Sequence, residues 1–231
     1  MIVFPDNWRE IGQPIPLQKI ENTILEILSE IDCDSLALSG GVDSSLLLYY
    51  LQRVKKKVRA YTMGKAIDHP DVVYSKSIVE SFGGIDDHVI YIPSEAEIKK
   101  AGGYVYSLFY EHVSRYTDNI IAGDGIDEFS CGYYSHQKNP TESQYYEFMR
   151  QLLPEHLIPL DAESGDVKVY LPYIDNRLIL LVSQIPTWLK VDKNSRKKII
   201  MSLAKDKLPS SILERWKYGF CDALNIKEAR L

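Results

Sequence analysis

Hydrophobic residues alternate between helical and extended spacing along the first part of the chain. In 16–31 they recur three and four positions apart, which predicts an amphipathic helix. Short apolar runs beside turn residues predict strands at 35–38, 58–63, 88–92 and 119–122. Helices are predicted between them at 44–53, 70–82 and 94–116, the last interrupted at Gly102 and Gly103. Strands that alternate with helices indicate parallel β-α-β units, so we expect an α/β fold with a parallel sheet and helices on both faces.

From residue 141 onward the pattern predicts helices and no convincing strand. Helical spacing covers 141–153, 172–185, 194–204 and 209–216. We therefore expect one domain over residues 1–231. It would have an α/β core at about 16–135 and a helical part at about 141–220 packed against that core.

The composition is typical of a folded globular chain, with 45% hydrophobic and 26% charged residues. The longest apolar run, around 46–51, is too short to span a membrane, and the N-terminus lacks the pattern of a signal peptide. The three cysteines are widely spaced, which argues against a disulfide scaffold, a zinc site and an iron–sulfur cluster. We expect a cytoplasmic protein without a membrane partner, and a homo-oligomer is compatible with the sequence.

The net charge of −5 makes nucleic acid an unexpected partner, but the charge is unevenly distributed. Nine basic residues lie between Lys190 and Lys217, opposed by three acidic residues. They are Lys190, Lys193, Arg196, Lys197, Lys198, Lys205, Lys207, Arg215 and Lys217. Two interpretations stay open: a solvated helix face, or cations of which some face a phosphate ligand.

The segment 39–45, Ser-Gly-Gly-Val-Asp-Ser-Ser, joins the first predicted strand to an apolar helix. Its two glycines permit a tight turn and a close approach of the backbone to a ligand. Free N–H groups at the start of the helix, with the nearby hydroxyls, suit a phosphate. Asp43 would repel that phosphate unless a divalent cation lay between them, so we interpret it as a Mg²⁺ ligand. The alternative is an ordinary glycine-rich turn.

A second motif, Gly123-Asp124-Gly125-Ile126-Asp127-Glu128, follows the fourth predicted strand. Ligands of parallel sheets bind at the carboxyl ends of strands, where both motifs lie. Asp127 can share a metal ion with Asp43 if the two strand ends are neighbours. The alternative is that these acidic residues serve in a turn and at a helix N-terminus.

Taken together, several segments resemble the synthetase domain of the asparagine synthetase family, a branch of the ATP pyrophosphatase superfamily. They are 39–45, 123–128, Gly132-Tyr133, 171–177 and 208–220, the last containing Arg215-Trp216-Lys217. The resemblance covers about 17–220 and implies an adenine nucleotide alpha hydrolase-like fold. It also implies ATP and Mg²⁺ as cofactors, with a carboxylate as substrate.

The resemblance implies a role for each matching residue. Asp43 and Asp127 would bind Mg²⁺ with pyrophosphate, and the loop residues Ser39, Gly40, Gly41, Ser44 and Ser45 would hold the β- and γ-phosphates. Backbone at Ala37, Met63 and Gly123 would frame the adenosine. Lys217 would stabilise charge at the α-phosphate or in a tetrahedral intermediate, and Asp124 would lie near the acceptor. The reaction implied is adenylation of a carboxylate, with release of pyrophosphate, followed by attack of ammonia or an amine.

The chain departs from the family pattern in two respects. About 35 residues precede the segment 39–45, which we call the phosphate loop after its predicted ligand, and Ile2 follows Met1. We therefore expect no glutaminase domain. The nitrogen donor would then be ammonia, another amine, or a separate amidotransferase subunit. In the acceptor half, Tyr170 replaces an arginine, Cys131 replaces a glycine, and Asp124 stands where glutamate is common. The acceptor carboxylate therefore stays open.

Three hypotheses follow for the function. The first is an AMP-forming amidoligase that uses ATP. The second is a tRNA- or nucleotide-modifying member of the same superfamily, for which the sequence shows no cysteine pair or added RNA-binding domain. The third is a non-catalytic or partner-dependent nucleotide-binding subunit. His69, His88, His112 and His136 are scattered and are interpreted as structural.

Overall fold

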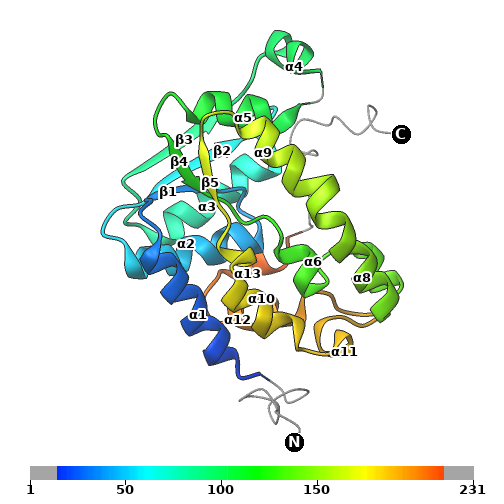
Figure 1. The fold of residues 1–231 in the computed structure, drawn as a ribbon. Helices are drawn as coiled ribbons and strands as arrows, with labels where there is room; N and C mark the ends of the chain where they lie inside the picture. The colour runs from blue at the N-terminus through cyan, green and yellow to red at the C-terminus, as the bar shows by residue number, and fades with distance from the viewer. Residues whose placement is uncertain (1–14, 103, 216–231) are drawn as a thin grey trace, which may run out of the picture.

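A parallel five-stranded sheet lies at the centre of the structure (Figure 1). The computed structural model describes residues 15–102 and 104–215. The strands are β1 (Ser35–Ala37), β2 (Arg59–Met63), β3 (Asp87–Tyr91), β4 (Asn119–Ile121) and β5 (Lys168–Tyr170). Their order across the sheet is β3-β2-β1-β4-β5, and every neighbouring pair is parallel. The α/β fold with a parallel sheet, predicted from the sequence, is confirmed.

The fifth strand shows that the prediction of no strand after residue 141 is wrong. β5 pairs with β4 in a register that runs from Asn119↔Lys168 to Ile121↔Tyr170. It is an edge strand of three residues, with one exposed and two half-buried side chains. A run this short carries no clear hydrophobic period, so pairing with β4 decides its conformation more than the local pattern does.

The helices of the first part lie close to their predicted positions. They are α1 (Leu17–Glu30), α2 (Val42–Val54), α3 (Pro70–Phe82), α4 (Glu95–Ala101) and α5 (Val105–Val113). Local chemistry fixes several ends. Ser94 and Glu97 form a capping box at the start of α4, and Gly83 follows the end of α3 with a φ of +62°. The predicted helix at 94–116 is interrupted at Gly102, as expected.

The second part is mainly helical. Its α-helices are α6 (Ile126–Ser130), α7 (Tyr134–Lys138), α8 (Glu142–Gln151), α9 (Ile158–Ser164), α10 (Asn176–Ser183), α11 (Thr187–Lys190), α12 (Lys198–Ala204) and α13 (Ser210–Leu213). A π-helical turn, η1 (Leu152–Leu157), joins α8 to α9, and a 3-10 turn, η2 (Pro172–Ile174), precedes α10. α6, α7 and α11 add three short helices to those predicted.

The helix predicted to stop at residue 153 continues through η1 and α9 to Ser164. Pro154 lacks the backbone N–H that the interior of an α-helix uses, so its presence predicted a stop. The backbone widens instead into a π-helical turn, in which the Ile158 N–H donates to the Leu153 carbonyl. This wider turn accommodates the proline within a continuous helical path.

Helix α12 begins at Lys198, four residues later than predicted, because a turn occupies the preceding residues. The Asp192 carboxylate accepts hydrogen bonds from the backbone N–H groups of Asn194 and Ser195, at 2.8 and 2.7 Å. Lys197 has left-handed backbone with a φ of +59°. Such side-chain hydrogen bonds and left-handed residues compete with helix formation.

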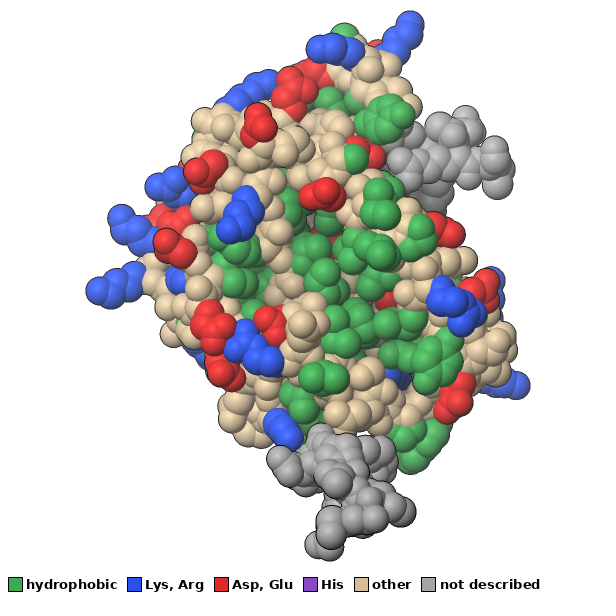
Figure 2. Space-filling view, in the orientation of Figure 1, with side chains coloured by type: hydrophobic (Ala, Val, Ile, Leu, Met, Phe, Trp, Pro, Cys, Tyr) green, Lys and Arg blue, Asp and Glu red, His purple; other side chains and the backbone are tan. Residues whose placement is uncertain are grey.

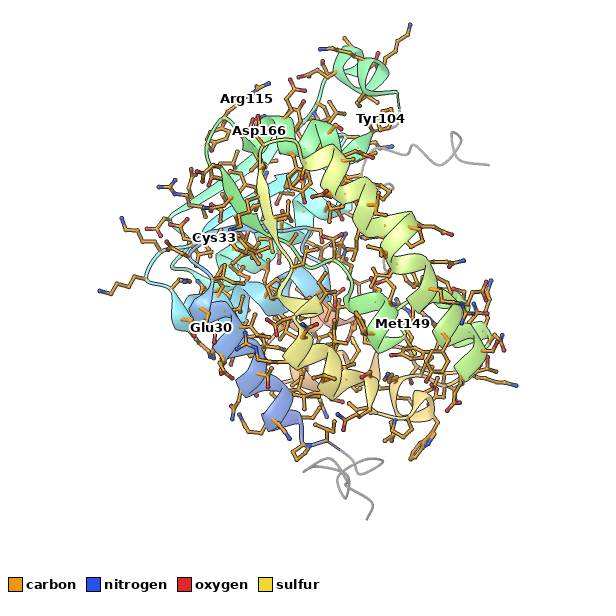
Figure 3. All side chains as sticks on the ribbon, viewed as in Figure 1. Glu30, Cys33, Tyr104, Arg115, Met149 and Asp166 are labelled. Carbon is orange, nitrogen blue, oxygen red and sulfur yellow. The ribbon has the colours of Figure 1, made fainter. Side chains whose placement is uncertain are left out.

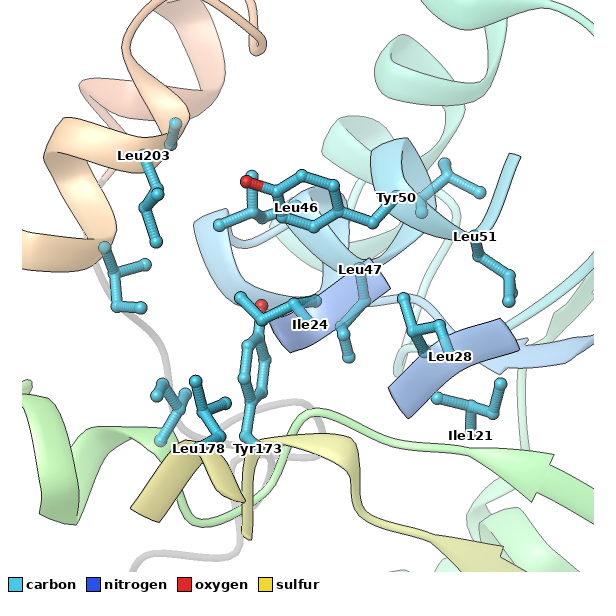
Figure 4. Close-up of a cluster of buried hydrophobic side chains, with 14 of the residues drawn as sticks. Ile24, Leu28, Leu46, Leu47, Tyr50, Leu51, Ile121, Tyr173, Leu178 and Leu203 are labelled. Carbon is cyan, nitrogen blue, oxygen red and sulfur yellow. The ribbon is translucent and has the colours of Figure 1, made fainter. Parts of the chain in front are cut away.

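One apolar cluster joins the sheet to the helical part (Figure 4). Leu46, Leu47 and Tyr50 on α2 are fully buried, in the same cluster as Tyr173 and Leu203 from the second part. Helix α2 contacts both α1 and α12, in keeping with its nearly continuous apolar surface. Burying one such side chain contributes about 1.5–3 kcal/mol. This cluster therefore fixes α2 and the loop that precedes it.

Helices cover both faces of the sheet. Ala60 and Tyr61 are neighbours on β2, and successive strand residues point to opposite faces. Ala60 belongs to the cluster that contains α1 and α2, whereas Tyr61 belongs to a second cluster that contains Phe109 of α5 and Leu160 of α9. Figure 1 shows α5 and α9 packed side by side over the sheet.

The two ends of the strands carry different loops. Cys33, Arg115 and Asp166 lie in the loops that lead into β1, β4 and β5 (Figure 3). The glycine-containing motifs lie at the opposite ends, where they follow the carboxyl ends of β1 and β4. Figure 2 shows apolar side chains across the middle of one face of the molecule, with charged side chains of both signs around them. Among the described residues, no helix combines the length and the apolarity that a membrane crossing requires.

Candidate active site

The two predicted motifs meet at the point where the strand order reverses. From β1 the chain moves to β2 and β3 on one side, and it returns to β4 on the other side of β1. Parallel sheets bind ligands in the crevice outside the carboxyl ends of the strands at such a reversal. A cavity of about 330 Å³ opens there, within the size range of ligand pockets.

Most of the predicted site residues line this cavity. They are Ala37, Ser39, Gly41, Asp43, Ser44, Met63, Gly123, Asp124 and Asp127. Gly40 lies in the turn between two of the lining residues, and Ser45 lies in the core with no accessible surface. Lys217 lies outside the described residues. The structure thus brings the predicted set together, except for Ser45 and the untested lysine.

The phosphate loop is held by its own hydrogen bonds. The Ser39 hydroxyl accepts a hydrogen bond from the Gly41 N–H at 3.3 Å, and the Ser44 hydroxyl accepts one from the Ser39 N–H at 3.2 Å. Gly40 has a φ of +70°, and a Cβ atom there would lie 2.4 Å from the backbone nitrogen of Ser75. Glycine is therefore required at residue 40 both by its conformation and by the close approach of α3.

Asp43 and Asp127, the predicted metal ligands, converge on one cation. The Lys197 ammonium donates a hydrogen bond to Asp127 Oδ1 at 2.6 Å and a second, short one to Asp43 Oδ2. Gly132 leaves room for this arrangement, since a Cβ atom on it would lie 1.8 Å from Asp127 Oδ1. Burial by itself would lower the pKa of Lys197, but the charges of Asp127 and Asp43 and their hydrogen bonds raise it. Lys197 therefore stays an ammonium.

The donor set fits Mg²⁺ that binds together with phosphate. In the described part of the chain, no group of three or more histidine, cysteine, aspartate or glutamate side chains forms a metal cage. Asp43 and Asp127 supply two carboxylates beside the phosphate loop. Mg²⁺ is usually bound by one or two protein carboxylates together with substrate phosphates, which matches this donor set.

Asp124, His156 and aromatic rings also line the cavity. His156 Nε2 lies 2.9 Å from Asp124 Oδ1, and the imidazole forms a T-shaped contact with the Tyr106 ring, with centroids 6.1 Å apart. The Tyr133 hydroxyl donates to Glu128 Oε1 at 2.7 Å. All five side chains line the cavity. This part of the cavity thus combines carboxylates, an imidazole and phenol rings.

Arg215, the last described residue, contacts the phosphate loop. Its Nη1 donates to the Ser39 carbonyl at 2.6 Å, and its Nη2 forms a buried ion pair with Asp71 at the start of α3. Both side chains of the pair are about 5% exposed or less. Arg215 therefore holds the loop backbone and α3 together at the edge of the cavity.

The structure adds residues that the motifs did not single out. Lys197 was one member of a basic stretch, and its left-handed backbone and turn carry no clear sequence signal. No local pattern marks His156, which is 32 positions from Asp124 and comes shortly after Pro154. Cys131, where the family pattern has glycine, has a φ of +58°, the backbone region that favours glycine.

Comparisons with known proteins agree with the motifs. The family model for asparagine synthase matches residues 35–163 and 149–230. Glutamine-hydrolyzing asparagine synthetases from Gallus gallus and Homo sapiens are 24% identical over 221 residues, and the one from Mesocricetus auratus is 25% identical over the same length. Each match covers 81% of this chain and 39% of the relative, so the chain spans well under half the length of these relatives.

A solved structure of NH3-dependent NAD synthetase from Campylobacter jejuni is also similar in part. It is 20% identical, with a TM-score of 0.41, and the match covers 73% of this chain and 92% of that chain. The family model spans most of the sequence and includes both loops at the cavity. By that match, the chain belongs to the asparagine synthase family.

Proposed function

We propose that this chain is an ATP-dependent amidoligase that adenylates a carboxylate and transfers ammonia or an amine to it. The observation that carries the proposal is the convergence of Asp43 and Asp127 on Lys197 beside the phosphate loop. Two carboxylates, a lysine and free helix N–H groups form a site for a metal-bound polyphosphate. Membership in the asparagine synthase family supports the ligase chemistry.

The nucleotide would lie across the strand reversal. The loop at 39–45 and the N-terminus of α2, a helix of 13 residues, would hold the β- and γ-phosphates. Backbone at Ala37, Met63 and Gly123 would frame the adenosine from the ends of β1, β2 and β4. All three residues line the cavity, which supports this placement.

Asp43 and Asp127 would hold Mg²⁺, which when bound neutralises phosphate charge. The substrate carboxylate oxygen forms a bond to the α-phosphorus, and the bond from that phosphorus to the bridging oxygen breaks, so pyrophosphate leaves. Bringing these anions together is unfavourable unless cations face them. We assign that role to Lys197, with Lys217 as a second candidate from outside the described residues.

The reaction also needs a nitrogen donor and an acceptor carboxylate. The matched relatives are named as glutamine-hydrolyzing and are much longer than this chain. Free ammonia, an amine or a separate amidotransferase subunit would supply the nitrogen here. L-Aspartate is the first acceptor to test, because the family is that of asparagine synthase.

We also propose a cytoplasmic location. The two cysteines in the described residues, Cys33 and Cys131, are both free thiols. Each is buried, and burial raises the pKa of each thiol to about 11. Buried neutral thiols are compatible with the reducing interior of a cell.

The test is release of pyrophosphate and AMP from Mg-ATP by the purified full chain. The substrates are a panel of carboxylates that starts with L-aspartate, each with and without ammonium. Release that depends on one carboxylate supports the proposal, and Asp43→Asn should abolish it. Asp68→Asn, a change at an exposed carboxylate outside the cavity, is the matched control. Tight ATP binding with no turnover across the panel would favour a partner-dependent or non-catalytic subunit instead.

A further inference from the structure

The Asp124–His156 pair lies in the cavity but takes no part in the phosphate chemistry assigned above. Asp124 comes from the loop after β4, whereas His156 comes from η1, the π-helical turn that follows α8. Their side chains are 21% and 28% exposed, so both are largely buried but still accessible from the cavity. π-Helical turns are rare and occur mostly at functional sites.

The surroundings of the pair suit a nitrogen nucleophile. Glu128 lines the same cavity and adds a second carboxylate, which the Tyr133 hydroxyl contacts. The Tyr106 ring contacts the imidazole. The backbone N–H of Tyr106 donates to Glu163 Oε2 at 3.1 Å, and this hydrogen bond fixes the start of α5. Carboxylates and aromatic faces attract an amine or ammonium group and disfavour a second anion.

Resting on the function proposed above, we propose that His156 is the general base that accepts the proton from the amine nucleophile, with Asp124 orienting it and stabilising the imidazolium. The class of nucleophile is ammonia or a primary amine. Nε2 of His156 contacts Asp124, so Nδ1 is the nitrogen that receives the proton. A carboxylate that orients a histidine and stabilises its charged form is an established arrangement in acyl transfer.

The step balances without a further reactant. The amine nitrogen forms a bond to the carbonyl carbon of the acyl-adenylate, and one N–H proton moves to Nδ1 of His156. The bond from that carbon to the phosphate oxygen then breaks, and AMP leaves with the electron pair. The products are the amide, AMP and an imidazolium, which returns its proton to solvent.

The electrostatics of the pair agree with this role. Burial would lower the pKa of His156, but the hydrogen bond and charge of Asp124, followed by the charges of Glu128 and Asp127, raise it above its ordinary value. The Tyr106 phenol on α5 also contacts the imidazole ring. A more basic imidazole is a stronger acceptor for the proton of a cationic intermediate.

The experiment separates the two half-reactions of the full chain with His156→Gln, using His112→Gln as a control. His112 stacks on Tyr91 and lies outside the cavity lining. Adenylation is followed by exchange of labelled pyrophosphate into ATP with L-aspartate and the other carboxylates of the panel. Amide formation is followed with ammonium, and hydroxamate formation with hydroxylamine, a stronger nucleophile that is largely deprotonated at neutral pH.

We expect His156→Gln to exchange pyrophosphate within about two-fold of the unchanged chain but to form amide about 10²–10⁴-fold more slowly with ammonium. Hydroxamate formation should fall much less. At a fixed concentration of free ammonia, the acid limb of the pH–rate profile for amide formation should disappear in His156→Gln. Asp124→Asn, which keeps a polar side chain but removes its charge, should shift that limb to lower pH.

Three outcomes would overturn the proposal. Equal losses in exchange and amide formation would show a structural role for His156, as would an unchanged pH profile. Amide formation by His156→Gln at the rate of the unchanged chain would exclude a base role. An unchanged chain that exchanges no pyrophosphate with any carboxylate would instead overturn the proposed function, and the base role with it.

Discussion

Lys197 donates a hydrogen bond to Asp127 at 2.6 Å across 70 positions of sequence, and the same ammonium contacts Asp43. The side chain of Lys197 is 5% exposed, so this charge is held in a largely water-free position. The two carboxylates lie in the first turns of α2 and α6, the helices that follow the neighbouring strands β1 and β4. Lys197 therefore neutralises the carboxylates that we assign to a metal ion.

Replacing Lys197 by methionine should strengthen the binding of Mg²⁺ in the absence of nucleotide. The change removes the Lys197 ammonium from its contacts with Asp43 and Asp127, which raises the attraction of these carboxylates for a divalent ion. We expect a larger Mg²⁺-induced increase in Tm than for the unchanged chain, measured by differential scanning fluorimetry. Lys198→Met, at an exposed ion pair with Asp192, is the control. Equal shifts in all three proteins would contradict the assignment of the metal ligands.

Adding a methyl group at Gly40 should destabilise the protein more than adding one at Gly83. Both glycines have positive φ angles, +70° and +62°, so each substitution costs about 1–3 kcal/mol of backbone strain. At Gly83 no atom lies within 4 Å of the added carbon, whereas at Gly40 backbone atoms of Tyr74 and Ser75 lie 2.4 Å away.

The measurement is urea denaturation of Gly40→Ala and Gly83→Ala with a parallel ATP-binding titration. The free energy of unfolding should fall clearly more in Gly40→Ala than in Gly83→Ala. Gly40→Ala should also lose most of its affinity for ATP. Gly83→Ala should bind ATP normally. Similar stabilities for the two variants would mean that α3 moves away from the loop at little cost.

The sequence predicts the parallel sheet and the two carboxylate-bearing loops because their signals are local. A glycine pair after an apolar run, or an apolar run before a helix, can be read within about ten residues. β5 carries no such local signal, because its three residues become a strand through pairing with β4. Lys197 and His156 lack a local signal for a different reason. Each contacts a carboxylate that is far away in the sequence, so the contact depends on the tertiary fold. Each also depends on irregular backbone: a left-handed residue for Lys197 and a π-helical turn for His156.

Arg215 and Asp71 should show strong energetic coupling in a double-mutant cycle. Breaking a buried ion pair from one side costs about 3–5 kcal/mol, because the remaining charge is left without its partner. Arg215→Met and Asp71→Asn should each lose stability of this order, and the double variant should lose less than the sum. The free energies of unfolding come from urea titrations.

A functional consequence accompanies the stability change at Arg215. Its second hydrogen bond supports the Ser39 carbonyl in the phosphate loop, so Arg215→Met should raise the KM for ATP more than Asp71→Asn does. Arg215→Lys should not restore the wild-type KM, since one ammonium does not reproduce the two directed contacts of the guanidinium. Strict additivity of the two single changes would show that the pair is not a coupled unit.

Lys190 should reduce the stability of the folded protein at neutral pH. Its side chain is fully buried, its Nζ has no hydrogen-bond partner among the described residues, and it lies 4.0 Å from the centre of the Tyr145 ring. Burial lowers the pKa of Lys190 to about 8, with a small opposing effect of Cys131. The ordinary lysine pKa is about 10.4, so the unfolded chain binds more protons than the folded one between about pH 8 and 10. Stability therefore rises with pH across that window.

Lys190→Met removes the buried charge, and we expect it to stabilise the protein at pH 7 by about 1–3 kcal/mol after loss of the cation–π contact is subtracted. The advantage should shrink as the pH rises from 8 to 10, because the unchanged lysine then loses its proton in both states. Urea denaturation at pH 7 and at pH 9.5 measures both effects, with Lys193→Met, at an exposed lysine, as the control. If Lys190→Met is no more stable than Lys193→Met at pH 7, the Tyr145 ring compensates the whole cost of burying the ammonium.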